Sequence, residues 1–187
     1  MIRDPLRPPV CLVVDTNLLL LVVGYQCLQL EKAQAFERTR VLTEIRGRDD
    51  GISPDRFDDL WNLFWSAARR IVTQHVIAET YGLRRKLASF RHRRDLVWES
   101  AIMLLAKPGI EEQSCLVHDV LAQEGYRDIL VELGPTDAGL IYTAEQLQAT
   151  IITDDGTLAR WAAVRSVMGS LCVAGWCPNS ALPVLGT

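Results

Sequence analysis

The sequence predicts an α/β protein, a three-layer sandwich in which helices flank a central parallel sheet. Short apolar runs at 10–14 and 150–153, rich in valine and isoleucine, have the pattern of strands buried on both faces. Amphipathic segments alternate with these runs, as expected when helices connect parallel strands. A length of 187 residues suits one domain. We therefore expect an N-terminal arm at 1–9 and a single domain at 10–187.

In the first half of the chain, the strand at 10–14 is followed by an apolar segment at 18–23 that predicts a helix. A second helix is expected within 31–48, followed by a loop ending in Ser53 and Pro54, which resemble an N-cap and a first helical residue. The helix after Pro54 carries a stripe of large apolar residues at helical spacing, which indicates core packing. A short strand at 71–72 and a helix at about 74–90 come next.

In the second half, helices are expected at about 95–106 and 112–124, and a weak strand at 128–133. The segment Gly134-Pro135-Thr136 starts another helix, which ends near residue 148. A buried strand at 150–153, a helix at 156–167 and a last strand at 171–174 complete the pattern.

Composition excludes several classes of protein. The formal charge of −3 excludes a uniformly basic nucleic-acid coat, although a local basic patch stays compatible with it. Five cysteines without a C-x-x-C pair indicate neither a zinc site nor a disulfide framework, which favours the cytoplasm. The three histidines lack metal-ligand spacing. Polar residues at 15–17 interrupt the N-terminal apolar run, so it predicts neither a signal peptide nor a membrane span.

Acidic residues follow both buried strands directly. Asp15 comes after the strand at 10–14, and Asp154 and Asp155 come after the strand at 150–153. In open α/β sheets, ligands bind just beyond the carboxyl ends of the strands. An acid at such a position is therefore either part of a site or a residue that caps the following helix.

Two further acids lie on helix faces expected to be buried. Glu79 is flanked at helical spacing by Val76 and Leu83. Asp137 lies in the first turn of its helix, where a carboxylate is also favoured by the helix dipole. Each acid has a structural explanation when taken alone. Together they predict a cluster at one end of the sheet, and a hard divalent cation, Mg²⁺ or Mn²⁺, would neutralise buried carboxylates of this kind.

Four fragments in order resemble the PIN-domain nucleases. They are Val13-Val14-Asp15-Thr16-Asn17, Val76-Ile77-Ala78-Glu79, Gly134-Pro135-Thr136-Asp137-Ala138 and Thr153-Asp154-Asp155-Gly156-Thr157-Leu158. The resemblance spans about residues 10–174, and the segments 26–53 and 91–128 are longer than a minimal member needs. It implies a PIN-like sandwich with helical insertions.

The resemblance also implies an activity, the metal-dependent endonucleolytic hydrolysis of RNA phosphodiester bonds. Asp15, Glu79, Asp137 and Asp155 would hold one or two Mg²⁺ or Mn²⁺ ions and carry catalysis. Asp154 is either a second ligand or a solvent-facing neighbour. Supporting roles in orienting carboxylates or water fall to Thr16, Asn17 and Thr153.

A basic cluster follows the Glu79 helix and consists of Arg84, Arg85, Lys86, Arg91, Arg93 and Arg94. It is either a contact surface for RNA phosphates or a solvated face. The resemblance is compatible with a toxin restrained by an antitoxin-like partner and with a processing enzyme, and a homodimer is compatible with either.

Other function classes stay open. A PIN-fold protein can keep the acids and serve as a catalytically weak or inactive RNA-binding or scaffold protein. Haloacid dehalogenase-like phosphatases need Asp-x-Asp after the first strand, and this chain has Asn17 at the second position. A dinucleotide-binding domain is disfavoured because no Gly-x-Gly-x-x-Gly follows that strand.

Overall fold

A computed structural model of the protein describes residues 10–46, 54–83, 94–166, 172–175 and 184–185. The elements in chain order are β1 (Cys11–Val14), α1 (Thr16–Leu30), α2 (Ala35–Arg46), α3 (Pro54–Ser66), β2 (Arg69–Thr73), α4 (Gln74–Leu83), α5 (Arg94–Leu105), β3 (Ile110–Gln113), α6 (Val117–Leu121), α7 (Tyr126–Leu147), β4 (Thr150–Thr153), α8 (Gly156–Ser166), β5 (Cys172–Gly175) and β6 (Val184–Leu185). The predicted arm at 1–9 lies outside the described residues.

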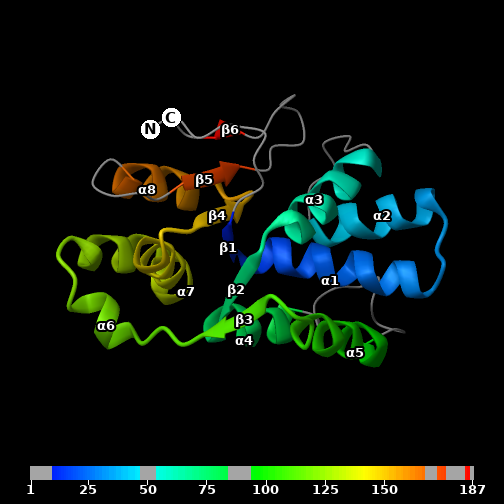
Figure 1. The fold of residues 1–187 in the computed structure, drawn as a ribbon, viewed down its shortest axis with the longest axis horizontal. Helices are drawn as coiled ribbons and strands as arrows, with labels where there is room; N and C mark the ends of the chain where they lie inside the picture. Colours follow the sequence, from blue (N-terminus) through cyan, green and yellow to red (C-terminus); the bar gives the residue numbers. More distant parts are fainter. Residues whose placement is uncertain (1–9, 47–53, 84–93, 167–171, 176–183, 186–187) are drawn as a thin grey trace.

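The strands form one six-stranded sheet in the order β3-β2-β1-β4-β5-β6. Every pairing is parallel except that of β5 with β6. In Figure 1 the strands stack from β3 at the lower edge to β6 at the upper edge, with α1, α2, α3 and α5 on one side and α6, α7 and α8 on the other. The predicted three-layer α/β sandwich is therefore confirmed.

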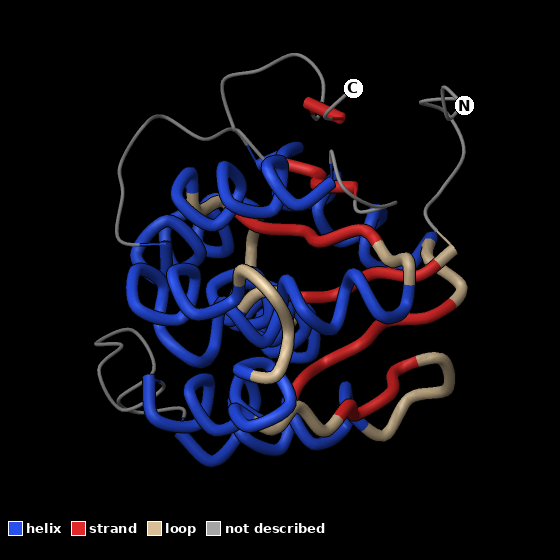
Figure 2. The backbone as a smooth tube through the Cα atoms, turned by 90° about the vertical axis from the view of Figure 1, so that its left-hand side faces the viewer, coloured by secondary structure: helices blue, strands red, loops and turns tan. Residues whose placement is uncertain are grey.

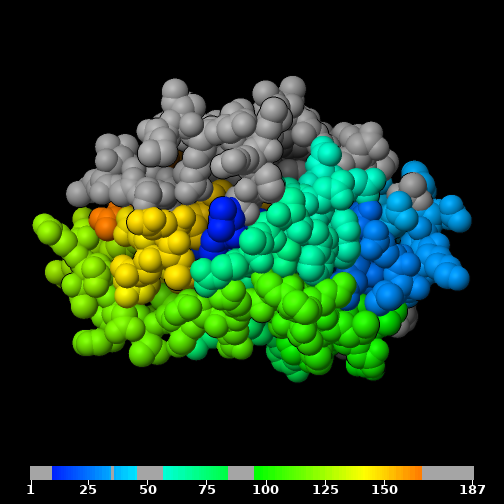
Figure 3. Space-filling model, in the orientation of Figure 1, coloured from blue at the N-terminus to red at the C-terminus, as the bar shows by residue number. Residues whose placement is uncertain are grey.

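The central strands owe their position to their apolar side chains. All four residues of β1 and of β4 are buried, as expected for strands covered on both faces. The strands lie side by side in Figure 2. The dark-blue start of the described chain reaches the surface in Figure 3, so that view shows the edge at which β1 begins. The carboxyl ends of the parallel strands lie at the opposite edge.

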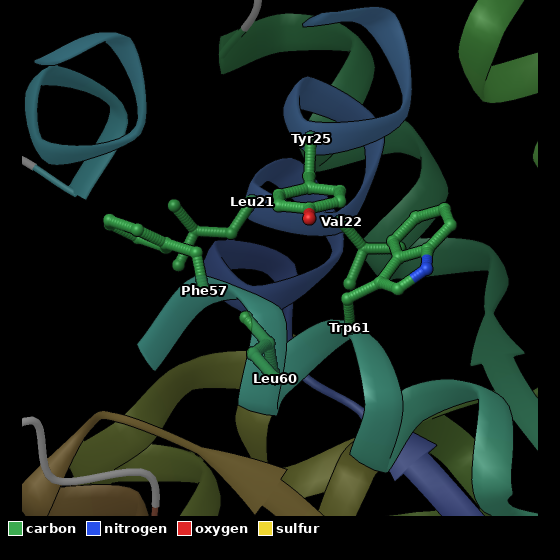
Figure 4. Close-up of a pocket in the computed structure, with 6 residues that line it drawn as sticks. All are labelled: Leu21, Val22, Tyr25, Phe57, Leu60 and Trp61. Carbon is green, nitrogen blue, oxygen red and sulfur yellow. The ribbon is translucent and has the colours of Figure 1, made fainter. Parts of the chain in front are cut away.

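Helix α1 is longer than the predicted 18–23 segment because it is buried nearly all round, under α2, α3, α4 and α5. A shallow depression remains between α1 and α3, without enclosed space for a water molecule. Its lining residues are mainly apolar, as Figure 4 shows: Leu21, Val22, Tyr25, Phe57, Leu60 and Trp61. The phenol of Tyr25 donates a hydrogen bond to Asp58. A depression of this kind offers no set of groups that could bind a metal ion or a phosphate.

Two predicted elements are wrong. Residues 112–113 end the strand β3 instead of starting a helix, and only 117–121 are helical there. The strand β3 consists of Ile110 and three polar residues at the exposed edge of the sheet, so its sequence lacks the apolar alternation that would predict a strand. The expected strand at 128–133 is helical, with Ile129 buried and Val131 83% exposed. The apolar residues of this run belong to one face of an amphipathic helix, except for Val131, which is exposed.

Helix α7 consists of two halves that meet at Gly134. The backbone there (φ 83°, ψ 176°) is not helical and is accessible essentially to glycine alone. Pro135 then opens the second half, in agreement with the predicted helix start. This break places Asp137 in the first turn of a new helical segment.

A polar cluster joins the two halves of α7 to α8. Tyr126, at the start of the first half, donates its hydroxyl proton to Glu145 of the second half at 2.7 Å. Arg165 of α8 donates to both oxygens of the same carboxylate, at 2.6 and 3.0 Å, and its guanidinium lies 4.6 Å from the centre of the Tyr126 ring. The cluster therefore fixes the angle between the halves, and with it the direction of the segment that carries Asp137.

Among the residues that the structure describes, none of the helices combines the length and apolar character needed to cross a membrane.

Candidate metal-binding site

Asp15 and Asp155 are brought together by the pairing of β1 with β4, in which Val14 lies opposite Ile152. The two acids follow these adjacent parallel strands at the same edge of the sheet. Thr153 links them: its hydroxyl donates to Asp15 Oδ2 at 2.8 Å and accepts a bond from the backbone N–H of Asp155 at 2.9 Å. The strand register therefore places both acids at one point of the sheet edge.

Asp15 does not act as a helix cap through its side chain. It occupies the N-cap position of α1, but its carboxylate makes no capping hydrogen bond. The residue is only 4% exposed. Burial raises the pKa of Asp15 to about 6, against the opposing effects of the Thr153 hydroxyl and the nearby backbone amides. A buried carboxylate that makes no capping hydrogen bond favours the site interpretation of Asp15.

Asp155 does act as a cap. One of its oxygens, Oδ1, accepts bonds from the backbone N–H groups of Thr157 at 2.6 Å and Leu158 at 3.1 Å, in the first turn of α8. The capping alternative therefore holds at this position, and capping fixes the carboxylate at the sheet edge through one of its two oxygens. Its neighbour Asp154 is half-buried and lies close enough to raise the pKa of Asp15.

Glu79 is exposed, so its predicted burial is wrong. The buried face of α4 is centred on Val76 and Thr80, and Glu79 lies at the margin of that face, where it reaches solvent. Thr16, the first residue of α1, donates its hydroxyl proton to Glu79 Oε2 at 3.0 Å. This bond ties the Glu79 carboxylate to the residue next to Asp15.

Asp137 shows that the four acids share one region. The pKa of Asp137 is raised to about 7, first by burial and then by the negative charges of Asp15, Asp155 and Glu79. Charges act on a carboxyl group in this way only at short range. These three acids come from separate elements, yet all of them act on Asp137.

The donor chemistry of the four acids fits Mg²⁺ or Mn²⁺, which prefer carboxylate oxygens and would remove the repulsion at Asp137. Within the described ranges, however, no three His, Cys, Asp or Glu side chains are grouped as closely as the ligands of a bound metal ion. Side-chain rotation would therefore have to bring the carboxylate oxygens together around a cation.

The supporting residues divide into two groups. Thr16 and Thr153 each donate to one of the acids, as the sequence led us to expect. Asn17 is exposed in the first turn of α1, and its backbone amide helps to lower the pKa of Asp15.

The predicted phosphate contacts fall almost entirely outside the described residues. Five of the six cations lie within 84–93, and Arg94 is described only as the first residue of α5. Their contact with RNA therefore stays a prediction.

Sequence reasoning missed one residue near the site. His75 lies four residues before Glu79 and therefore on the same face of α4. That spacing is visible in the sequence, but it gains meaning only from the bond that His75 makes with Cys115, a loop residue that packs against α7.

A search for related proteins gave no assignment: no protein-family model matches the chain, and no curated protein matches it.

Proposed function

We propose that the protein is a Mg²⁺- or Mn²⁺-dependent endoribonuclease of the PIN type. One observation carries the proposal: Asp137 lies within the electrostatic range of Asp15, Asp155 and Glu79. These are the four acids of the motifs that resemble the PIN family. Like charges converge in this way at considerable cost, and a bound cation would compensate for it.

In the proposed mechanism the four acids hold the metal, and the other residues hold the acids. Thr153 orients Asp15, Thr16 orients Glu79, and the first turn of α8 fixes Asp155 through its Oδ1. Asp137 supplies the fourth carboxylate from the start of its helical segment. A bound Mg²⁺ or Mn²⁺ would activate water and stabilise the charge that develops on the phosphate in the transition state.

The finer parts of the proposal follow the family resemblance. RNA is the substrate, the protein works in the cytoplasm, and it acts as a toxin with an antitoxin-like partner or as a processing enzyme.

The test uses the purified protein and single-stranded RNA labelled at either end, with Mg²⁺, Mn²⁺ or EDTA. We expect internal cuts that need the metal and are lost in Asp15→Asn and Asp137→Asn. The matched control is Asp128→Asn: Asp128 holds the third position of the first half of α7, as Asp137 does in the second half, but it is exposed. Cleavage that survives Asp137→Asn, or that is equally reduced by Asp128→Asn, would refute the proposed mechanism.

The second candidate function is a non-cleaving RNA-binding or scaffold protein, and the grouping of side chains favours it in one respect. The acids do not form a closed ligand set among the described residues. RNA binding in the presence of Ca²⁺, without any cleavage in Mg²⁺ or Mn²⁺, would support this candidate.

A further inference from the structure

The loop between β3 and α6 enters the protein interior at one residue, Cys115. This residue is 2% exposed, whereas its neighbours Ser114 and Leu116 are exposed. Its carbonyl oxygen lies 2.9 Å from His75 Nε2 of α4, and because a carbonyl can only accept, Nε2 donates the proton. Gln74 donates to the same oxygen at 3.4 Å. The start of α4 therefore holds this loop residue by its backbone.

On its other side Cys115 packs against the second half of α7. Its thiol lies 3.8 Å from the carbonyl oxygen of Gly139. A Cβ atom at Gly139 would lie 3.1 Å from the Cys115 sulfur and 4.0 Å from His75 Cδ2. Glycine is therefore needed at this position for close approach rather than for its backbone angles. His75, Cys115 and Gly139 form an interlock between α4 and α7.

The interlock joins the two helices that carry acids of the site. His75 lies one helical turn before Glu79, and Gly139 lies two residues after Asp137. The other two acids follow paired strands, whose backbone hydrogen bonds fix their separation. Glu79 and Asp137 come from helices that have no such ladder between them, so packing at the α4–α7 contact contributes to their separation, together with the bond from Thr16 of α1 to Glu79.

We propose that His75 is a positioning residue, which holds Cys115 between α4 and α7 and thereby sets the separation of the Glu79 and Asp137 carboxylates. The expected effect on metal affinity rests on the proposed function, whereas the effect on the separation does not. His75 needs no contact with substrate or metal for this role.

Two substitutions at His75 test the donor itself. His75→Leu keeps apolar volume but removes the bond to Cys115, whereas His75→Gln carries an amide N–H at about the position of Nε2. Calorimetric titration with Mn²⁺, at a temperature where circular dichroism shows both variants folded, should give a ~10–100-fold weaker affinity for His75→Leu. His75→Gln should restore most of the wild-type affinity. A side chain that serves only general stability would lower the melting temperature of His75→Leu without changing the Mn²⁺ affinity of the folded protein.

A second pair of variants acts from the α7 side and keeps the test valid if His75→Leu does not fold. Gly139→Ala crowds the Cys115 sulfur and should also weaken Mn²⁺ binding, and adding Cys115→Ala removes the crowded atom and should restore it. Equal Mn²⁺ affinities for wild type, His75→Leu and Gly139→Ala would overturn the inference.

Crystal structures separate this inference from the proposed function. The distance between the Cα atoms of residues 79 and 137 should change in His75→Leu, or in Gly139→Ala if His75→Leu does not fold, and should be retained in His75→Gln. A wild type that binds no Mn²⁺ would refute the metal site, and the crystal structures would then decide the inference alone. Unchanged distances in all the variants would refute the positioning role of His75.

Discussion

Neutralising Asp137 should stabilise the metal-free protein, which is unusual for a substitution at a half-buried polar residue. In the folded chain the pKa of Asp137 is about 7, against 3.8 for the group in its ordinary state. Between these values the folded protein binds a proton that the unfolded chain does not bind. The free energy of unfolding therefore falls as pH rises from about 4 through 7, and above pH 7 the penalty is fully present.

The size of this effect follows from the pKa shift. A rise from 3.8 to about 7 corresponds to about 4 kcal/mol at 1.36 kcal/mol per pKa unit. Solvent screens a half-buried group, so a measured effect of about 1–3 kcal/mol is more realistic. Asp137→Asn should therefore raise the unfolding free energy by about that amount at pH 8, and the difference from wild type should shrink toward pH 4.

Urea unfolding in EDTA between pH 4 and 8.5, followed by the fluorescence of the five tryptophans, measures this difference. Asp128→Asn is the matched control, and it should lose about 0.3–1 kcal/mol because its charge favours a helix start. If Asp137→Asn is destabilised like Asp128→Asn, Asp137 is merely a helix-start carboxylate, and the convergence of the four acids is refuted.

Three further predictions concern the support of the site. Thr153→Val removes the donor to Asp15 and should lower the free energy of unfolding by about 1–3 kcal/mol, more at pH 8 than at pH 5 because the bond favours the charged carboxylate. Urea unfolding measures this loss, with Thr150→Val on the same strand as the control, and an equal loss at both pH values would contradict the prediction. The added methyl of Gly134→Ala would meet no atom within 4 Å, but position 134 has a positive φ, so thermal unfolding should show a loss of stability of about 1–3 kcal/mol. Gly156→Ala, which is also without steric contact, should be nearly neutral, and equal effects of the two substitutions would show that the break in α7 is not strained. Neutralising Arg84, Arg85, Arg91 and Arg94 together should weaken RNA binding and flatten its salt dependence in fluorescence anisotropy, and an unchanged salt slope would mean that the cluster is only a solvated face.

The sequence was most informative where the chain is most buried. Uninterrupted apolar runs predicted β1 and β4, and the acids that follow them were placed correctly at the sheet edge, because a buried strand leaves few alternatives for its apolar residues. The half-exposed elements were harder to predict. The edge strand β3 pairs through its backbone while its side chains are mostly polar, so the sequence carries no strand period there.

The remaining errors arise from tertiary contacts. The exposure of Glu79 depends on which face of α4 packs against its neighbours, and helical spacing within α4 does not determine this. His75 was set aside because metal ligands were sought by spacing along the chain, whereas its partner Cys115 is distant in sequence and in turn contacts Gly139. Contacts of this kind follow from the packing of α4 on α7.

Titration of the metal-free protein with Mn²⁺ tests the central claim most directly. If Asp15, Glu79, Asp137 and Asp155 hold one site, Mn²⁺ should stabilise the wild type by about 2.7 kcal/mol at a hundredfold excess over Kd. Asp137→Asn should lose most of this gain, and Asp128→Asn should keep it. A wild type whose unfolding free energy does not respond to Mn²⁺, or an Asp137→Asn variant that responds fully, would contradict the assignment of these four acids to a metal site.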